Sequence, residues 1–455
     1  MKPAPAGGVD RGAGAAARAA TAGAGLAVAG TLALAGWLYA MPASFSSPWG
    51  LNQPGLAQFC ALWHLPAAAL TAPAFRVGFW LLLAAAWTGY GALVAAGLRG
   101  GRVPPGALRA LAAVAVAAMA LGCPPALSAD VYGYVGFGRL AALHHLNPLA
   151  TSQSALVGLG DPVAPFLGGD VASPYGPLWS ALSVAVVRAA ERAGVAGQVL
   201  AFKLLAGVAL LAAAAAARQA ASAARQTAAP AVDPRAGEAA FAFVALNPLL
   251  LIEGPGSGHN DLVMLALVLG AFAAVAAGRS RVAALAAGAA AAVKLVPLLL
   301  IPWLAWMAGG GGASTARDGR RSWRAALGSA ALALVPLLLS ALPFWDGART
   351  FAGLAAWWRE GHRGGSGTAG LLLLPVAYAV VSWTVVRTSR DRVNGLATGW
   401  ALASGAAIVL GAAAWFPWYL GWPLAGLAVR CDRRHALATA ALMLLAAVST
   451  ARYAG

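Results

Sequence analysis

The stretch SADVYGYVGFGRLAALHHLNP, residues Ser128–Pro148, interrupts an otherwise apolar chain with an acid, two tyrosines, an arginine and two histidines. It directly follows a strongly apolar segment, so Asp130 is predicted to lie where a helix leaves the membrane. Ionisable residues at such depths are costly and are often functional. We therefore interpret this stretch as the candidate active-site loop and the rest of the chain as the scaffold that holds it.

Composition places the chain among polytopic membrane proteins. Of its 455 residues, 60% are hydrophobic and only 10% are charged, and its mean hydropathy is +0.73, values that do not describe a soluble globule. Apolar runs of about 15 to 22 residues recur, close to the ~20 that a helix needs to cross a bilayer. Because no segment alternates like a barrel strand, an all-α bundle is expected.

The net charge of +17 does not indicate a nucleic-acid partner. The 28 arginines are scattered in small groups at the ends of apolar runs, which is typical of topogenic charge under the positive-inside rule. The three cysteines, Cys60, Cys123 and Cys431, lie far apart and predict neither a disulfide framework nor a zinc site. Membrane lipid is therefore the expected surrounding of most of the chain.

Arginine placement predicts about thirteen spans and the side on which each loop lies. Residues 1–20 are expected to form a disordered cytoplasmic tail, and residues 21–41 are interpreted as an uncleaved first helix rather than a secretory signal. Five of the six histidines fall outside in this arrangement, so function is expected to face outward at the cell membrane. Spans are predicted at about 22–41, 78–98, 107–127, 198–217, 239–252, 262–278, 282–295, 297–309, 325–343, 368–386, 396–413, 416–429 and 436–450.

Residues 176–193 are apolar enough for a short span, yet a crossing there would put Arg218, Arg225 and Arg235 outside. We therefore predict a juxtamembrane helix, although the sequence does not decide whether it crosses. The expected segments are N-terminal transmembrane helices at 21–127, an external catalytic loop with juxtamembrane helices at 128–197, a central transmembrane module at 198–343, a second external loop at 344–367 and C-terminal transmembrane helices at 368–455.

Asp130 is the candidate catalytic residue. A carboxylate there can act as general base on an acceptor hydroxyl while a nearby cation holds a phosphate leaving group. The alternative is that Asp130 caps the helix that follows it. Four aromatic residues can stack on a sugar face, although an interfacial aromatic belt explains them equally well. They are Tyr132, Tyr134, Tyr175 and Trp179.

Candidate cations follow in the same stretch. Arg139 lies nine residues after Asp130 and is followed by His144 and His145, so contacts with phosphate or carboxylate groups are expected there. Snorkelling of Arg139 to lipid headgroups and solvation of the histidine pair in a loop are the alternatives.

A second polar block, GSGHND at 256–261, precedes an apolar run, and the N-terminus of such a helix is a natural anion site. His259, Asn260 and Asp261 are therefore candidate phosphate ligands, with a helix cap as the alternative. His259 and Asp261, two residues apart, are weak evidence for a metal site, so a divalent cation is compatible with this block but is not predicted by it.

Lys294 lies near the outward end of a short predicted span. A buried lysine needs a partner, and a lipid phosphate is an attractive one. Snorkelling, or pairing with Glu253 or Asp261, is the alternative.

Five blocks of the sequence, in this order, resemble polyprenol-phosphate-mannose-dependent α-1,6-mannosyltransferases of the GT-C superfold. The resemblance covers residues from about 20 to 450. Each block alone is a loose match, whereas the occurrence of all five in this order is specific to the family. The blocks are the opening stretch, SPYGPLW from Ser173, NPLLLIEGPGSGHNDLVMLAL (Asn247–Leu267), AAAVKLVPLLLIPWLAW (Ala290–Trp306) and WFPWYLGWPLA (Trp415–Ala425).

The resemblance implies a polyprenyl-phosphate sugar donor, a glycan or glycolipid acceptor and an inverting transfer on the outer face. It implies a GT-C bundle of about thirteen spans and an external catalytic acid that matches Asp130, with Tyr132 and Arg139 beside it. Lys294 and the block that ends in Asp261 take the family's lysine and GHND positions. Mannose is carried over from the resemblance, because pocket shape selects the sugar. The alternative function is a polyprenyl-lipid carrier or flippase, which should show internal repeats that we do not find.

Overall fold

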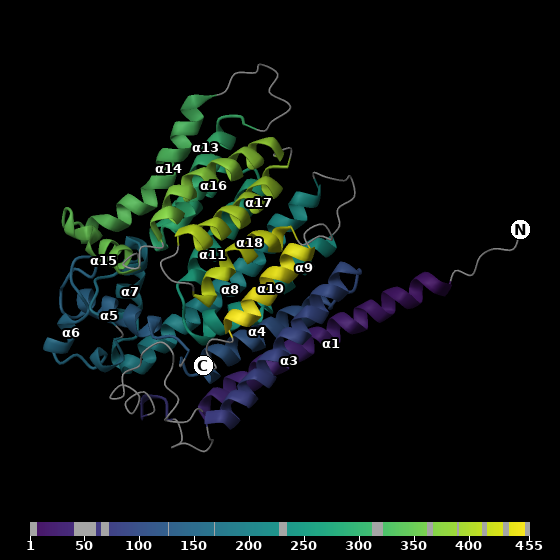
Figure 1. Ribbon diagram of the computed structural model, residues 1–455, viewed down its shortest axis with the longest axis horizontal. Helices are drawn as coiled ribbons and strands as arrows, with labels where there is room; N and C mark the ends of the chain where they lie inside the picture. The colour runs from purple at the N-terminus through teal and green to yellow at the C-terminus, as the bar shows by residue number, and fades with distance from the viewer. Residues whose placement is uncertain are drawn as a thin grey trace, which may run out of the picture.

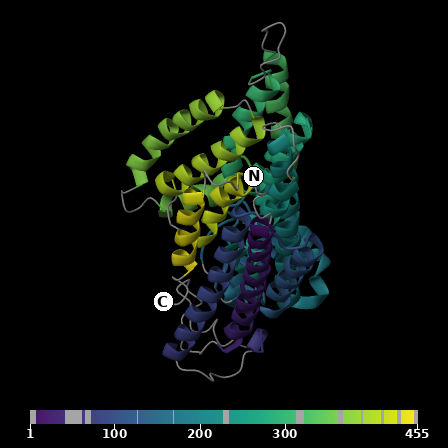
Figure 2. The same cartoon turned by 90° about the vertical axis from the view of Figure 1, so that its right-hand side faces the viewer.

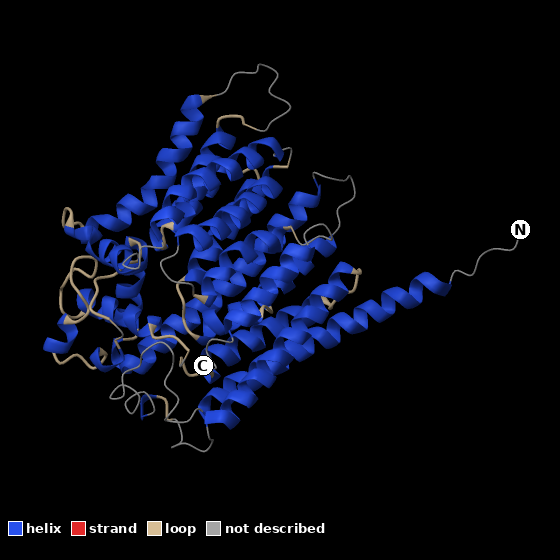
Figure 3. Cartoon of the chain, viewed as in Figure 1, coloured by secondary structure: helices blue, strands red, loops and turns tan. Residues whose placement is uncertain are grey.

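The computed structural model describes residues 7–40, 61–64, 72–125, 127–167, 169–226, 234–311, 322–361, 367–388, 391–411, 416–430 and 436–450. Throughout these ranges the chain forms helices joined by loops, with no strand (Figure 3). Six of these helices are long and apolar enough to cross a membrane, or seven if one bent pair is counted as a span. The predicted class, an all-α polytopic membrane protein, is confirmed.

Each predicted span coincides with a helix or with two consecutive helices. Several of these helices are shorter than a bilayer-crossing helix. The helices are α1 (Gly7–Trp37), α3 (Ala72–Leu98), α4 (Pro105–Gly122), α8 (Gly194–Gln226), α9 (Pro234–Ala245) with α10 (Pro248–Leu251), α11 (Asp261–Ala276), α12 (Ser280–Val293), η5 (Val296–Leu300) with α13 (Ile301–Ala308), α14 (Trp323–Ala341), α16 (Gly367–Thr388), α17 (Arg392–Ala406), η9 (Pro417–Leu420) with α18 (Gly421–Val429), and α19 (Ala436–Thr450).

Helix α1 begins earlier than the sequence suggests. Residues 7–20, expected in a disordered tail, form its first turns, because the alanines of this segment favour helix strongly. Further along, α1 lies against α3 (Figures 1 and 2). A Cβ atom on Gly89 would lie 2.4 Å from the backbone nitrogen of Ala27. The two backbones therefore approach as closely as small residues allow.

Shorter helices gather at one side of the bundle, on the left of Figure 1. They come from the two segments predicted to be external loops. They are α5 (Asp130–Ala142), α6 (Ala155–Gly158), α7 (Pro177–Ala189) and α15 (Ala352–Gly361). Helices α5 and α7 pack tightly, because a Cβ atom on Gly138 would lie 2.5 Å from the carbonyl oxygen of Ser183.

The span predicted at 239–252 is not one straight helix. Its two parts, Ala236–Ala245 and Pro248–Gly256, meet at an angle of 49°. Asn247 lies at the break and its side-chain oxygen accepts hydrogen bonds from the next two free backbone N–H groups, so a new helix starts there. The second part ends in the π-helical turn η4 (Ile252–Gly256), a feature that often marks functional sites.

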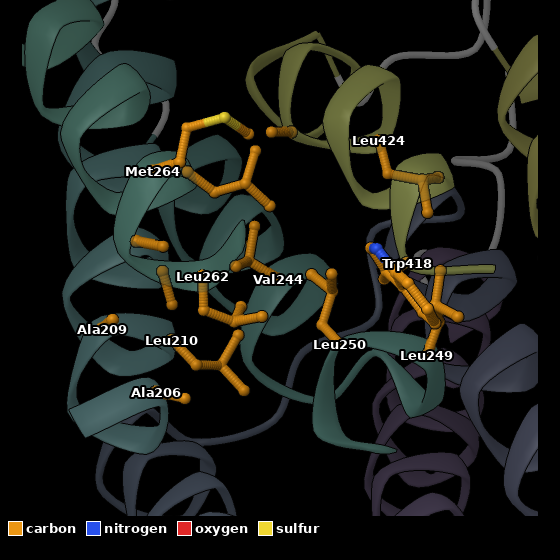
Figure 4. Close-up of a cluster of buried hydrophobic side chains, with 14 of the residues drawn as sticks. Ala206, Ala209, Leu210, Val244, Leu249, Leu250, Leu262, Met264, Trp418 and Leu424 are labelled. Atoms are coloured by element: carbon orange, nitrogen blue, oxygen red, sulfur yellow. The ribbon is translucent and has the colours of Figure 1, made fainter. Parts of the chain in front are cut away.

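Apolar side chains from several helices fill the space around this break (Figure 4). Leu210 of α8, Val244 of α9, Leu250 of α10 and Leu262 of α11 are each at most 4% exposed. Close packing of this kind resists displacement. It therefore fixes the position of the loop between η4 and α11, which carries His259.

Candidate active site

Asp130 is the first residue of α5. The N-cap position is held by Ala129, so Asp130 does not occupy the position that the capping alternative requires. The hydroxyl of Tyr175 donates to Oδ2 of Asp130 at 3.2 Å. Burial and the charge of Asp130 raise the pKa of Tyr175 well above its usual value, so this hydroxyl keeps its proton. The Asp130 side chain is 32% exposed, which leaves the carboxylate accessible to a substrate.

His259 approaches Asp130 from the loop before α11. Its Nε2 atom lies 3.7 Å from Oδ2 of Asp130 and 3.1 Å from Oγ of Ser128. The buried ring stacks on Trp418 with ring centroids 4.1 Å apart. Burial opposes the charged form of His259, but its hydrogen bond to Glu253 and the surrounding carboxylate charges outweigh burial, so the pKa of His259 is raised.

Asp261 and Lys294 form an ion pair beside His259. The Lys294 ammonium lies 2.9 and 3.0 Å from the two oxygens of Asp261, and Nε1 of Trp422 donates to Asp261 at 2.6 Å. The ammonium also lies over the rings of Tyr419 and Trp422 at 4.8 and 5.1 Å, within cation–π range. The Asp261 side chain is 1% exposed and that of Lys294 is 15% exposed, so Lys294 is the more accessible member of the pair.

Tyr134 connects the aromatic residues to the GHND block. Its hydroxyl donates to Oδ1 of Asn260 at 3.3 Å, and its ring meets Tyr175 and Trp179 edge to face at 5.1 and 5.0 Å. Asn260 makes no side-chain capping bond, and its buried Nδ2 has no hydrogen-bond acceptor among the described residues. Since buried donors are normally paired, this amide is a candidate donor to a substrate oxygen. Trp179 is 1% exposed, so it packs against Tyr134 inside the protein.

The side chain of Arg139 pairs with Asp161 and does not join the residues around Asp130 and His259. Its guanidinium Nε lies 2.8 and 3.0 Å from the carboxylate oxygens of Asp161, and its Nη1 donates to Gln198 at 3.2 Å. Nε2 of His144 lies 2.7 Å from the same carboxylate. Burial opposes ionisation of Asp161, but these hydrogen bonds outweigh it and lower its pKa. The predicted phosphate contact of Arg139 therefore competes with a buried ion pair.

Tyr132 lies on α5 two residues after Asp130. Its hydroxyl accepts a hydrogen bond from Trp63 at 2.7 Å, and its ring stacks on Phe166 with centroids 5.1 Å apart. The side chain is fully buried in these contacts. Its placement therefore favours a packing role over the predicted contact with sugar.

Sequence reasoning missed several residues that contact the site. Glu253 was considered only as a partner of Lys294, although an acid at the end of an apolar run is itself a functional signal. Ser128 gave no signal of its own. Trp418, Tyr419 and Trp422 belong to the block WFPWYLGWP, which was used only for the family resemblance and was given no role in the site.

The carboxylates and histidines of this site do not form a metal-binding cluster. Among the described residues, no group of three or more His, Cys, Asp or Glu side chains is arranged to hold a metal ion. What the site offers is the accessible carboxylate of Asp130, the buried imidazole of His259 at 3.7 Å from it, the ammonium of Lys294 paired with Asp261, and the amide of Asn260.

Two family models match the chain. One, described as “Alpha-(1->6)-mannopyranosyltransferase, N-terminal domain”, matches residues 22–310. The other, described as “Glycosyltransferase family 87”, matches residues 175–451. The GHND block and Lys294 lie in both matched regions, and Asp130 lies in the first. No curated protein and no solved structure matches the chain.

Proposed function

Because the chain belongs to the α-(1→6)-mannopyranosyltransferase family and is a membrane glycosyltransferase, we propose that it moves mannose from a polyprenyl-phosphate donor to a glycan or glycolipid. The observation that carries the proposal is that His259 lies 3.7 Å from Asp130 and also feels the charge of Asp261, which is paired with Lys294. The carrier alternative loses support, because both matching families are glycosyltransferases.

Asp130 is the base in this proposal. The site has two carboxylates that could take a proton from an acceptor hydroxyl, Asp130 and Asp261. Asp261 is 1% exposed and bound by Lys294 and Trp422, whereas Asp130 is 32% exposed and its Oδ2 is held by Tyr175. A base must lie within hydrogen-bond reach of the proton that it removes, and this favours Asp130.

Lys294 binds the donor phosphate in this proposal. An ammonium has three N–H donors, and two of those of Lys294 are directed at Asp261, which leaves one for a phosphate oxygen. The amide of Asn260, next to Asp261 in the chain, supplies a further donor. The site lies beside apolar helices that cross the membrane, so a polyprenyl chain can stay in lipid while its phosphate and sugar reach Lys294.

The transfer is a single displacement with inversion. Asp130 takes the proton of the acceptor hydroxyl as that oxygen forms a bond to the anomeric carbon of the sugar. The bond between the anomeric carbon and the phosphate oxygen breaks, and its electron pair leaves with the polyprenyl phosphate. Cationic and hydrogen-bonding groups around that phosphate stabilise the charge that develops on it.

The outward orientation follows the distribution of arginines in the sequence. In this orientation the loops that carry Asp130, His259 and Lys294 lie on the outer face of the cell membrane, and donor and acceptor meet there. Arg139 and Tyr132 have no substrate contact in the proposed site, because their side chains are bound elsewhere.

Transfer by the purified protein in lipid nanodiscs tests the donor. The panel contains polyprenyl-phosphate mannose, polyprenyl-phosphate glucose, polyprenyl-phosphate arabinose and a nucleotide-linked mannose, each offered with an α-mannoside acceptor. We expect transfer from polyprenyl-phosphate mannose and an α-1,6-linked product. Transfer from the nucleotide sugar alone would contradict the lipid-linked donor, and transfer from another polyprenyl sugar alone would contradict mannose.

A further inference from the structure

Glu253 is a fully buried carboxylate to which the transfer step above gives no role. Its Oε2 lies 3.1 Å from Nδ1 of His259. On the other edge of the ring, Nε2 faces Oγ of Ser128 at 3.1 Å and Oδ2 of Asp130 at 3.7 Å. The imidazole of His259 therefore bridges two carboxylates, one sealed inside the protein and one open to substrate.

The groups around the ring favour its doubly protonated form. Nδ1 faces two acceptors, the carboxylate of Glu253 and the backbone carbonyl of the same residue at 3.0 Å, so it carries a hydrogen. An imidazolium also carries a hydrogen on Nε2 and donates toward Ser128 and Asp130. Trp418 stacks on the ring face, which suits a cation. A buried carboxylate is costly without a counter-ion, and His259 supplies that counter-ion.

Other charged groups near the ring do not replace this pair. Asp261 follows in the next turn and is bound to Lys294. Lys203 of α8 passes close to Gly258, but its ammonium donates to the backbone carbonyl of Cys123. Glu253 and Asp130 are thus the two carboxylates that His259 meets directly.

Backbone geometry fixes the position of the His259 ring relative to Asp130. The backbone N–H of His259 donates to the carbonyl of Glu253 at 3.0 Å, so the residue is tied to η4 through its main chain and its side chain. Gly258 adopts a φ of +81°, which favours glycine. A Cβ atom there would lie 2.9 Å from the side chain of Val131. The loop therefore packs directly on the residue after Asp130.

We propose that Glu253 is a positioning residue that fixes His259 as an imidazolium, and that this imidazolium orients the carboxylate of Asp130 toward the acceptor hydroxyl. This role rests on the proposed function of Asp130 as base. The raised pKa of His259 agrees with the geometry, since the contact with Glu253 is the strongest influence that raises it.

The test replaces Glu253 with Gln, which keeps the shape of the side chain and removes its charge. Without that charge the pKa of His259 falls, so the imidazolium is lost at a lower pH. We expect kcat at neutral pH to fall about 100-fold, a size typical of lost acid–base assistance, with the donor KM changed less than about threefold. The alkaline limb of the pH profile of kcat should move to lower pH, which a purely structural role would not produce.

Glu238→Gln is the matched control. Glu238 lies in α9, where it pairs with Arg109 and Arg218 at 3.3 and 2.7 Å, and its substitution should leave kcat and the pH profile unchanged. Should Glu253→Gln not yield folded protein, Glu253→Asp takes its place, with the same direction and a smaller shift. A wild-type kcat and pH profile in the folded variant would overturn the role of Glu253.

Asp130→Asn, assayed in parallel, separates the two claims. An inactive Asp130→Asn together with a Glu253→Gln that behaves like wild type overturns only the positioning role. An active Asp130→Asn overturns the proposed base itself.

Discussion

The ammonium of Lys294 lies 2.9 and 3.0 Å from the two carboxylate oxygens of Asp261. This ion pair joins the end of α12 to the start of α11, and Trp422 of α18 donates to the same carboxylate. Three helices are therefore tied together at the point where the proposed donor phosphate binds. The pair holds the ammonium in place and, in the proposed function, leaves one of its N–H groups for the donor phosphate.

Lys294→Met should weaken donor binding. Loss of a hydrogen bond to a charged group costs about 1.5–3 kcal/mol, so the donor KM should rise at least tenfold, with a smaller change in the acceptor KM. Steady-state kinetics with polyprenyl-phosphate mannose measures this. The variant also leaves Asp261 unpaired, so Lys294→Met/Asp261→Asn serves as the control for stability. The double variant should recover thermal stability but not donor affinity. A wild-type donor KM in the single variant would return Lys294 to a purely structural role.

The ion pair of Arg139 and Asp161 should stabilise the fold rather than bind donor. Their side chains are 10% and 1% exposed, and removing one partner of such a pair costs about 3–5 kcal/mol. Asp161→Asn should therefore lower the Tm and leave the donor KM unchanged. The pKa of Asp161 is depressed, so its contribution is present above its ordinary pKa of 3.8 and is lost as the pH falls further.

The control for this variant is Asp346→Asn, because Asp346 is exposed and its pairing with Arg349 spans 3.5 Å. Such surface pairs contribute little, so its Tm should match that of the wild type. If Asp161→Asn instead raised the donor KM at an unchanged Tm, the cluster around Arg139 would belong to the donor site.

The architecture could be predicted largely from the sequence, because helices that cross a lipid bilayer appear in the sequence as long apolar runs. Each of the thirteen predicted spans coincides with helical residues. The break at Asn247 was missed, since a hydropathy pattern does not register a bend whose two halves are equally apolar. The early start of α1 at Gly7 was missed because its alanines and glycines resemble a linker by composition.

The candidate site was predicted in part. Asp130, the block ending in Asp261, and Lys294 were singled out because charge in an apolar chain is conspicuous, and the structure brings these residues together. Arg139 is equally conspicuous, but its partner Asp161 lies in a loop whose path the sequence does not reveal. The role proposed for Glu253 was not predicted, because it depends on the contact of its carboxylate with Nδ1 of His259. That contact is a property of the tertiary structure alone.

Gly176→Ala should disturb the packing between α7 and α12 next to the site. A Cβ atom at this position would lie 2.1 Å from the carbonyl oxygen of Ala292, and the backbone N–H of Gly176 donates to Val293 at 3.0 Å. The contact joins Tyr175 to the end of the helix that precedes Lys294. Overpacking of this kind costs about 1–3 kcal/mol, so both the Tm and kcat should fall.

Gly158→Ala is the matched control for that substitution, because none of the described residues has an atom within 4 Å of the added Cβ. Thermal-shift and transfer assays on the two variants measure the difference. Equal behaviour of the two alanine variants would show that the contact between α7 and α12 does not hold the site.

The predicted orientation can be tested with single cysteines. Ser154 lies in the loop before α6 and Ser280 begins α12, and both are exposed. In a background where Cys60, Cys123 and Cys431 are replaced by serine, an impermeant maleimide added to intact cells should label Ser154→Cys and not Ser280→Cys. Both should be labelled after the cells are opened. Labelling of Ser280→Cys alone in intact cells would invert the orientation and place the site inside.

Transfer by Asp130→Asn tests the central claim most directly. The substitution keeps the shape of the side chain and removes its ability to take a proton, and the exposed Asp170 of the same loop provides the control variant Asp170→Asn. We expect kcat of Asp130→Asn to fall by a factor of about 10² to 10⁴, with donor binding and Tm unchanged and with Asp170→Asn active. A kcat near that of the wild type would contradict the assignment of Asp130 as the base.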